Sequence, residues 1–247
     1  MIDFRLDGRT ALVTGASRGL GWSIAEALRD LGATVYGTSR DPRAARRIAD
    51  HLGTTPLVLD VDDVDAAAAA IDGLAASGVV PDLLVNNAGI NRPQPSLEVD
   101  LQSWEAIYAS NVRGVFFVTQ ALLRHWVRLG VHGSVVTIGS QTARVAVEDR
   151  AAYGSSKAAI EQLTRNLALE FAPNGIRFNV VSPTFVRTEL TAATLAGPLG
   201  PVLLERVPLG RFGEPDDIAG AVAFLLGPAA AMITGHTLMV DGGYTIR

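Results

Sequence analysis

Short runs rich in β-branched residues alternate with longer helical patterns along the whole chain of 247 residues. Most of these runs are apolar at every position, which is typical of parallel strands that are covered on both faces. The sequence predicts strands at 10–14, 34–38, 56–60, 82–86, 134–138, 177–181 and 237–240. It predicts helices near 19–31, 42–52, 63–77, 103–129, 153–172 and 215–226. This alternation indicates an α/β protein with one doubly wound, seven-stranded parallel sheet and helices on both faces.

The pattern continues without a linker or an internal repeat, so we expect a single Rossmann domain over residues 1–247. One connection is unusual, because residues 182–214 are rich in Gly, Pro, Thr and Leu and are too long for an ordinary loop. Loops of that length tend to be functional lids. We therefore expect a substrate lid near 188–210. Candidate pocket residues follow Ser140 or lie on the lid: Gln141, Thr142, Val147, Leu190, Leu195, Leu199 and Leu203.

Charge and composition argue against several classes of function. The chain is 48% apolar, with a formal net charge of −4 and a pI near 5.6, which gives no electrostatic case for nucleic acid or an anionic membrane. No cysteine is present, so disulfides and thiolate metal sites are excluded, and the four histidines show no ligand spacing. Residues 218–240 carry no charged side chain, but Gly227-Pro228 and Gly235-His236 interrupt them, which favours a buried helix and strand. The N-terminus has no apolar run typical of a signal peptide, so we expect a cytoplasmic protein.

Three glycines follow the first predicted strand and open the first predicted helix: Gly15, Gly19 and Gly21. Glycine at this place lets backbone N–H groups approach a pyrophosphate, whose charge the helix N-terminus favours. The spacing is G-x-x-x-G-x-G rather than the usual G-x-G-x-x-G, and a structural turn is the alternative. The position on the first strand–helix unit favours a dinucleotide. The candidate contacts in this loop are Gly15, Ser17, Arg18, Gly19, Leu20 and Gly21.

The end of the second predicted strand bears on which dinucleotide is bound. An acidic residue there suits the ribose 2′-OH of NAD, whereas arginine accommodates the 2′-phosphate of NADP. The chain offers Ser39 and Arg40, and Arg18 supplies a second guanidinium from the glycine loop. Asp41 is the dissenting residue, but it lies one position late and precedes a proline. The pattern favours NADP(H), with NAD(H) and plain surface arginines as the alternatives.

Tyr153 and Lys157 are four residues apart on one predicted helix and therefore share a face. Lys157 is the single lysine of a chain that contains 20 arginines. Lysine is a compact point charge, and a nearby ammonium stabilises phenolate and lowers the pKa of a phenol. A surface Tyr/Lys pair is the alternative, but the lone lysine favours a general acid/base centre.

These residues and several ordered motifs resemble the short-chain dehydrogenase/reductase family from about residue 8 to residue 244. The motifs are TGASRGLG (14–21), NNAG (86–89), Asn111 in YASNVRG, Ser140 in TIGSQTA, YGSSK (153–157) and VDGG (240–243). The 3-oxoacyl-carrier-protein reductase and gluconate-type dehydrogenase branches are resembled about equally. The resemblance implies a homotetramer, with helices 103–129 and 153–172 in one interface and the 218–240 region in another.

The resemblance also implies roles for four catalytic residues: Asn111, Ser140, Tyr153 and Lys157. Tyr153 would transfer a proton to or from the substrate oxygen, and Ser140 would hydrogen-bond that oxygen. Lys157 would hold the nicotinamide ribose and lower the pKa of Tyr153, and Asn111 would hold a water that relays protons. The sequence supports Asn111 independently, because it interrupts an otherwise apolar helical stripe, although a satisfied core asparagine is the alternative.

For the cofactor, the resemblance implies contacts from Asp60 and Val61 to the adenine, and from Asn87, Ala88 and Gly89 to its ribose and the adjoining crevice. Tyr153 and Lys157 would also contact the cofactor. Pro183, Val186 and Thr188 would lie along the nicotinamide. The family commonly has Pro-Gly after the sixth strand, whereas this chain has Pro183-Thr184, which adds a side chain at the approach to the nicotinamide.

The function expected is an NADP(H)-dependent oxidoreductase that interconverts a carbonyl and a secondary alcohol. An NAD-dependent sugar-acid or alcohol dehydrogenase is the first alternative. A non-catalytic dinucleotide sensor is a remote one, because a binding protein does not need the full set of catalytic side chains. An extended-branch epimerase is disfavoured by the short length and the glycine spacing. An acidic acyl carrier protein would need a basic patch, and Arg124, Arg128 and Arg165 are more typical of solvated faces. No metal, nucleic acid or membrane partner is expected, and the small-molecule substrate stays unnamed.

Overall fold

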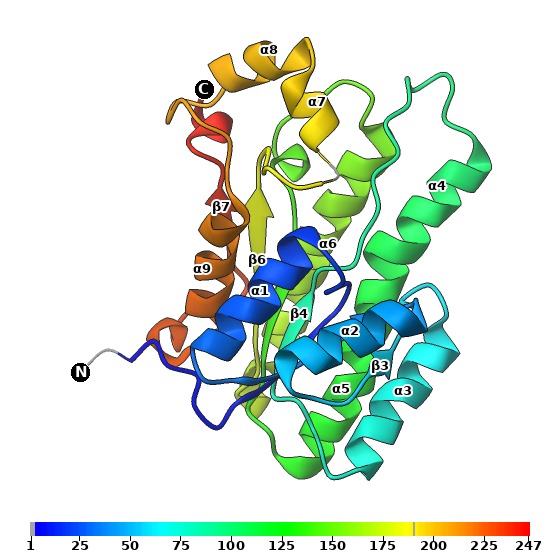
Figure 1. Cartoon of the computed structure of the whole chain (residues 1–247), viewed down its shortest axis with the longest axis vertical. Coiled ribbons are helices and arrows are strands. Elements are labelled where there is room, and N and C mark those ends of the chain that lie inside the picture. The colour runs from blue at the N-terminus through cyan, green and yellow to red at the C-terminus, as the bar shows by residue number, and fades with distance from the viewer. Residues whose placement is uncertain (1–2, 190) are drawn as a thin grey trace.

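A seven-stranded parallel sheet forms the centre of the molecule (Figure 1). The computed structural model describes residues 3–189 and 191–247. The strands follow the order β3-β2-β1-β4-β5-β6-β7, and every neighbouring pair is parallel. They are β1 Thr10–Val13, β2 Thr34–Ser39, β3 Leu57–Val58, β4 Leu83–Asn86, β5 Ser134–Ile138, β6 Arg177–Pro183 and β7 Thr237–Val240. The predicted doubly wound sheet is confirmed.

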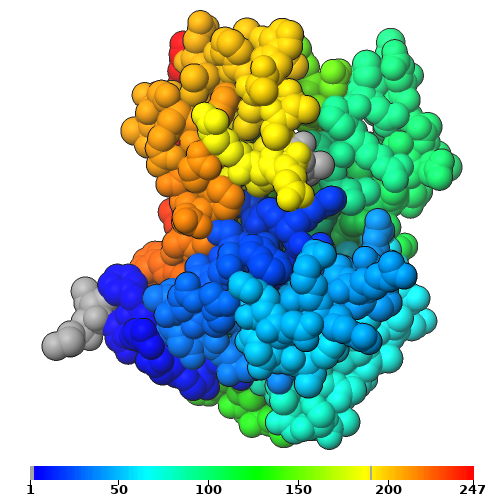
Figure 2. Space-filling model, viewed as in Figure 1, coloured from blue at the N-terminus to red at the C-terminus, as the bar shows by residue number. Residues whose placement is uncertain are grey.

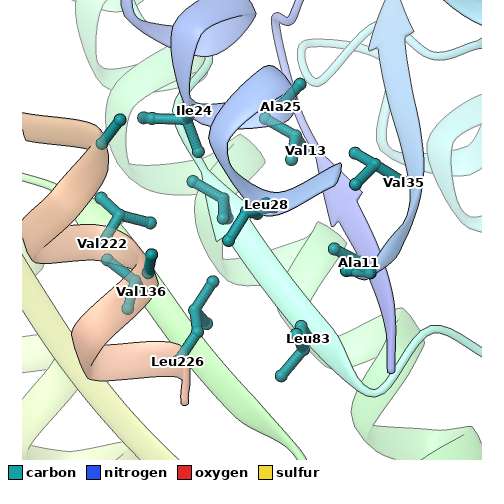
Figure 3. Close-up of a cluster of buried hydrophobic side chains, with 14 of the residues drawn as sticks. Ala11, Val13, Ile24, Ala25, Leu28, Val35, Leu83, Val136, Val222 and Leu226 are labelled. Atoms are coloured by element: carbon teal, nitrogen blue, oxygen red, sulfur yellow. The ribbon is translucent and has the colours of Figure 1, made fainter. Parts of the chain in front are cut away.

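Helices cover both faces of this sheet. They are α1 Gly19–Asp30, α2 Pro42–Leu52, α3 Val64–Ala76, α4 Leu101–Tyr108, α5 Val115–Leu129, α6 Ala151–Phe171, α7 Ala192–Ala196, α8 Leu199–Glu205 and α9 Pro215–Leu226. In β1, Ala11 and Val13 pack with Ile24 of α1 and Val222 of α9, as Figure 3 shows. Leu12, between them, packs on the other face with residues of α3, α5 and α6. Because both faces are covered, the strand is apolar throughout.

The chain reverses its direction across the sheet between β1 and β4. From β1 it moves outward to β2 and β3, then returns to β4 on the other side of β1 and continues to β7. At such a switch point, the loops after the two central strands diverge and leave a crevice at the carboxyl ends of the strands. The glycine loop after β1 and the NNAG segment of β4 lie at this crevice.

The helix predicted over 103–129 is interrupted. The structure has α4, then a π-helix over Ala109–Gly114, and then α5. A Cβ on Gly114 would lie 2.6 Å from the carbonyl oxygen of Val61, so the bulge brings the backbone against the loop after β3. The apolar pattern is carried through the bulge, which is why hydropathy predicted one continuous helix.

The expected lid is more regular than its sequence predicts. Residues 182–214, read as irregular, contain the end of β6 and the short helices α7 and α8. Figure 2 shows these helices, in yellow and orange, above the first turns of α1, in blue. Hydrogen bonds from the Thr191 hydroxyl to Val186 and Thr188 fix one end of the segment, and a bond from Leu209 N–H to the Gly242 carbonyl fixes the other. The pocket candidate Leu190 lies outside the described residues.

The uncharged stretch 218–240 forms α9, a short 3₁₀ turn and β7. Ile218, Val222 and Leu226 are fully buried, which confirms the predicted buried helix. The strand β7 is only half-buried, contrary to the prediction, because it is an edge strand paired with β6 alone. None of the helices in the described part of the chain has the length and apolar character needed to cross a membrane.

Candidate active site

The glycine loop is packed too closely to accept side chains at its key positions. Gly15 has φ +65°, and a Cβ there would lie 3.0 Å from the Cα of Ala88. A Cβ on Gly21 would collide with the carbonyl of Gly15 and the side chain of Asn87. The helix α1 starts at Gly19 with no side-chain cap, so its first N–H groups are directed at the crevice without a local side-chain partner.

Asn87 ties this loop to the end of β4. Its side-chain amide donates to the carbonyls of Thr14 (3.0 Å) and Gly15 (3.1 Å). The backbone N–H groups of Asn87 and Ala88 both donate to the Thr14 hydroxyl, each at 3.0 Å. The predicted contacts from the first and fourth strands therefore form one rigid wall of the crevice.

At the end of β2, Ser39 is buried and Arg40 is exposed. The carboxylate of Asp41, the acidic residue that would favour NAD(H), caps α2 by accepting the Arg43 N–H at 2.9 Å and so has a structural partner. Arg18, in the glycine loop at the N-cap of α1, is also exposed. A contact that the sequence analysis missed comes from Arg47 of α2, which donates to the Ser17 carbonyl at 3.2 Å. Its place in the one dense arginine group, RAARR, was the available signal.

Asp60 and Val61 follow β3 at the same edge of the sheet. The Asp60 carboxylate accepts the N–H of Asp62 at 3.0 Å, and the Val61 backbone contacts the π-helix at Gly114. That bond forms a turn after β3, which has two residues rather than the five predicted.

Asn111 is fully buried on the π-helix, and its side-chain amide hydrogen-bonds the backbone of Ile90. Its Oδ1 accepts the Ile90 N–H at 2.8 Å, and its Nδ2 donates to the Ile90 carbonyl at 2.9 Å and to the Ser156 hydroxyl at 3.1 Å. These bonds satisfy the buried amide. The predicted role in holding a water stays a prediction.

Lys157 is 5% exposed and lies close to both the NNAG segment and Tyr153. Its Nζ donates to the Ile138 carbonyl at 2.8 Å and lies 5.6 Å from the centroid of the Tyr153 ring. A Cβ on Gly89 would lie 3.7 Å from Nζ and 2.9 Å from Oδ1 of Asn111. Burial lowers the pKa of Lys157 from its usual 10.5 to about 8.

The predicted effect of Lys157 on the pKa of the Tyr153 phenol stays a prediction. Burial raises the pKa of the Tyr153 phenol above its usual value, while the nearby Ser140 hydroxyl and the positive charge of Arg150 oppose that rise. The Lys157 ammonium donates a hydrogen bond to the Ile138 carbonyl rather than to the phenol. Burying the phenolate costs more free energy than Ser140 and Arg150 offset by stabilising it. The phenol in this structure therefore stays protonated at neutral pH.

Ser140 follows β5 and caps a short 3₁₀ turn over Gln141–Ala143. Its hydroxyl accepts from the Thr142 hydroxyl at 2.9 Å and donates to the Gln141 side chain at 3.0 Å. The structure thus brings the four predicted catalytic residues to one place, at the carboxyl ends of β4 and β5.

The segment after β6 passes beside the glycine loop. A Cβ on Gly19 would lie 3.7 Å from the Thr188 side chain, and Val186 forms a bridge with Gly213. Pro183 ends β6. The hydroxyl of Thr184 is buried and has no hydrogen-bond partner among the residues that the structure describes. The departure from Pro-Gly thus leaves one buried polar atom for a ligand to satisfy.

Comparison with known proteins agrees with this geometry. A family model described as enoyl-(acyl carrier protein) reductase matches residues 15–245. The D-threitol dehydrogenase of Mycolicibacterium smegmatis is 41% identical over 99% of this chain and 96% of its own length. The structure of a gluconate 5-dehydrogenase from Burkholderia cenocepacia, in complex with NADP and tartrate, is 37% identical with a TM-score of 0.94 and covers 100% of this chain and 98% of its own.

The 3-ketoacyl-(acyl-carrier-protein) reductase of Brucella melitensis, complexed with NADH, is 34% identical with a TM-score of 0.89, and the match covers 97% of this chain and 99% of that one. The fold and these relatives define an oxidoreductase of the doubly wound α/β class. More specifically, the chain belongs to the short-chain dehydrogenase/reductase family, whose members act on CH–OH and carbonyl groups.

Proposed function

We propose that this protein is an NADP(H)-dependent oxidoreductase that interconverts a carbonyl and a secondary alcohol, with Tyr153 as the acid/base. The observation that carries the proposal is the convergence of Tyr153, Lys157, Ser140 and Asn111 beside a glycine loop that excludes side chains. A protein that only bound a dinucleotide would not need this set.

The residues present fit a dinucleotide. The backbone of the glycine loop and the N-terminus of α1 would hold the pyrophosphate, and Asp60, Val61 and the 87–89 backbone would hold the adenosine. Tyr153 and Lys157 would hold the nicotinamide ribose. Pro183, Val186 and Thr188 would line the nicotinamide, and the unpartnered hydroxyl of Thr184 suits a polar group there. When bound, the cofactor supplies the hydride chemistry.

Two exposed arginines support NADP(H) over NAD(H). Arg18 is the N-cap residue of α1, Arg40 directly follows β2, and a 2′-phosphate would lie between these two places. Asp41 is occupied in capping α2. The gluconate 5-dehydrogenase relative was solved with NADP. An NAD-dependent sugar-acid or alcohol dehydrogenase is the second candidate, and the relative solved with NADH supports it.

Tyr153 would donate a proton to the carbonyl oxygen in reduction and accept one from the alcohol in oxidation. The Ser140 hydroxyl, which donates to Gln141 in this structure, would turn to donate to the same oxygen. The two donors together would fix the carbonyl and stabilise the charge that develops on it.

The assembly and location are also proposals. We propose a homotetramer, supported by the exposed Leu169 on α6 (82%) and Met232 after α9 (97%), which lie on the two regions expected at interfaces. The cysteine-free sequence suits a reducing compartment, and we propose the cytoplasm. The segment 188–210 is proposed as the substrate lid.

The deciding experiment compares Tyr153→Phe with the wild type in carbonyl reduction and in cofactor binding. We expect the variant to lose turnover by roughly 100-fold or more, while NADPH binding, followed by nicotinamide fluorescence, stays within about threefold of the wild type. Tyr108→Phe is the matched control, because Tyr108 donates to the Ser155 hydroxyl of the neighbouring helix. Full activity of Tyr153→Phe would refute the proton-donor role, and absence of dinucleotide binding in the wild type would refute the proposed function.

A further inference from the structure

The Ser140 hydroxyl lies in a hydrogen-bond network formed by its own turn. Its Oγ accepts the backbone N–H of Thr142 at 3.2 Å and lies 2.9 Å from the Thr142 hydroxyl. Its own O–H donates to Oε1 of Gln141 at 3.0 Å. Three groups therefore surround this buried hydroxyl, and two of the three belong to Thr142.

The direction of each bond follows from the number of protons available. A serine hydroxyl has one proton to donate and two lone pairs that can accept. The Oε1 atom of Gln141 carries no proton, so the proton of Ser140 lies in that bond. The bond between the two hydroxyls must then use the proton of Thr142. Thr142 thus fills both lone pairs of Ser140, one with its N–H and the other with its O–H.

The turn that carries Thr142 is packed against the helix of the proposed acid/base residue. A Cβ on Gly154, which directly follows Tyr153, would lie 3.2 Å from the Thr142 carbonyl oxygen. At the end of the same turn, Nε of Arg144 pairs with the buried carboxylate of Glu161 at 2.7 Å. Both contacts are made with α6. The helix that carries Tyr153 therefore also fixes the position of Thr142.

A hydroxyl whose two lone pairs are occupied can interact with a ligand only as a donor. A carbonyl oxygen of the substrate would take the place of the Gln141 side chain and receive the Ser140 proton. In the oxidation direction, the proton of the substrate alcohol would find no free lone pair on Ser140. Tyr153 would then be its acceptor, so the two bonds from Thr142 keep Ser140 out of the proton transfer.

We infer that Thr142 is a positioning residue, which acts through Ser140 and makes the Ser140 hydroxyl an obligate hydrogen-bond donor to the substrate oxygen. The inference rests on the proposed function. It gives Thr142, predicted as a pocket residue, a role that needs no contact with the substrate. The same role should therefore hold for every substrate that the pocket accepts.

The test is a double-mutant cycle between Thr142→Val and Ser140→Ala. Valine keeps the shape of threonine and lacks the hydroxyl. NADPH-dependent reduction is measured with whichever of 2,3-butanedione, erythrulose and ethyl acetoacetate the wild type reduces fastest. In the wild-type background, Thr142→Val should lower kcat roughly tenfold and change KM for the carbonyl compound by less than about threefold. In the Ser140→Ala background, it should change kcat by less than about twofold, because the group through which it acts is gone.

Two further variants serve as controls. Thr142→Ser keeps the hydroxyl, and its kcat should stay within about threefold of the wild type. Thr54→Val is the matched control, because Thr54 donates its hydroxyl to the Val35 carbonyl of β2 at 3.1 Å, and its kcat should equal that of the wild type.

Three kinetic results would overturn the inference. An equal loss from Thr142→Val in both backgrounds would mean that Thr142 acts independently of Ser140. A higher KM at unchanged kcat would assign Thr142 to substrate binding. Full activity of Thr142→Val would show that its hydroxyl does nothing for Ser140.

Crystal structures of the wild type and of Thr142→Val test the same inference without turnover. In the wild type, Oγ of Ser140 should stay within hydrogen-bond distance of the Thr142 hydroxyl. In the variant, the Ser140 side chain should leave that rotamer or divide between two, and an unchanged rotamer would refute the positioning role. If the wild type reduces none of the three carbonyl compounds, the proposed reduction of such compounds fails, while the two structures still decide the role of Thr142.

Discussion

Lys157 shows how burial changes the chemistry of one side chain. Its folded-state pKa of about 8 lies below the usual 10.5, so between these values the unfolded chain binds more protons than the folded one. The free energy of unfolding therefore rises with pH across this window, and the cost of burying the ammonium is fully present below about pH 8.

Lys157→Met should remove this pH dependence. Between about pH 7 and pH 10.5 we expect the wild type to gain on the order of 3 kcal/mol of stability relative to the variant. Urea unfolding of both proteins at the two pH values measures the difference, in which the titration of shared groups such as Tyr153 largely cancels. Parallel pH profiles would mean that Lys157 keeps its ordinary pKa in the folded protein.

Arg40→Ala tests the cofactor preference at one side chain. Removing the guanidinium should weaken NADPH binding by roughly 10- to 100-fold and NADH binding by less than about threefold, because NADH has no 2′-phosphate. Fluorescence titration with both cofactors gives the two ratios. Arg43→Ala, a change to another exposed arginine of the same helix start, is the control. An equal loss for both cofactors would contradict the assignment to the 2′-phosphate.

The sequence predicted the reacting residues of the site but not their partners. A lone lysine four residues after a tyrosine is visible in one dimension, whereas the bonds from Asn111 to Ile90 and from Lys157 to Ile138 join residues 21 and 19 positions apart. The raised pKa of Tyr153 depends on burial, which the motif does not encode.

At the scale of elements, the start of α9 depends on Asp217. Its carboxylate accepts the Glu214 N–H at 2.8 Å and pairs with Arg211 from the end of the segment that carries α7 and α8. These contacts lower the pKa of Asp217 to about 2, so their stabilising effect is present above its usual pKa of 3.8 and is lost as the pH falls toward 2.

Asp217→Ala should lower the free energy of unfolding by about 1 kcal/mol near neutral pH, which is the usual cost of losing a helix cap. Urea unfolding measures it. Asp65→Ala removes an exposed first-turn aspartate of α3 and should change stability by less than about half as much. Equal effects of the two changes would show that the capping bonds contribute nothing specific.

Sequence periodicity predicted most strands to within two residues, because a buried parallel strand is apolar throughout. It did not predict the π-helix at Ala109–Gly114, since one inserted residue per turn leaves the apolar stripe nearly unchanged. It did not predict α7 and α8, because both are too short to show a helical period.

At the scale of the whole molecule, the doubly wound topology brings all the predicted motifs to one edge. The motifs span residues 14 to 243. All of them except Asn111 and YGSSK, which lie on helices, begin at or just after the end of a strand, and parallel strands place their carboxyl ends together. Strand order alone therefore explains why the site could be assembled from the sequence, while the substrate, which depends on loop side chains, could not.

The proposed homotetramer is tested by mass. Light scattering of the purified protein should give about four times the chain mass of 26.0 kDa. Leu169→Glu places a charge on the exposed face of α6 and should shift the protein to smaller species, while the exposed Asp65→Ala should leave the mass unchanged. A wild type that elutes and scatters as a monomer would refute this assembly.

The scarcity of lysine also makes amine-reactive reagents selective for one internal side chain of this protein. Besides the amine at the N-terminus of the chain, Lys157 carries the sole primary amine in the sequence, and it is 5% exposed. Because its pKa is about 8, a sizeable fraction of that amine is unprotonated and nucleophilic near that pH. The arginine-covered surface offers guanidinium groups that remain protonated and react poorly with acylating reagents. Acylation at Lys157 therefore reports on a single site inside the protein. The fraction of molecules that gain mass at Lys157 measures how many have an unoccupied site, and the fraction protected from labelling measures how many hold a bound ligand.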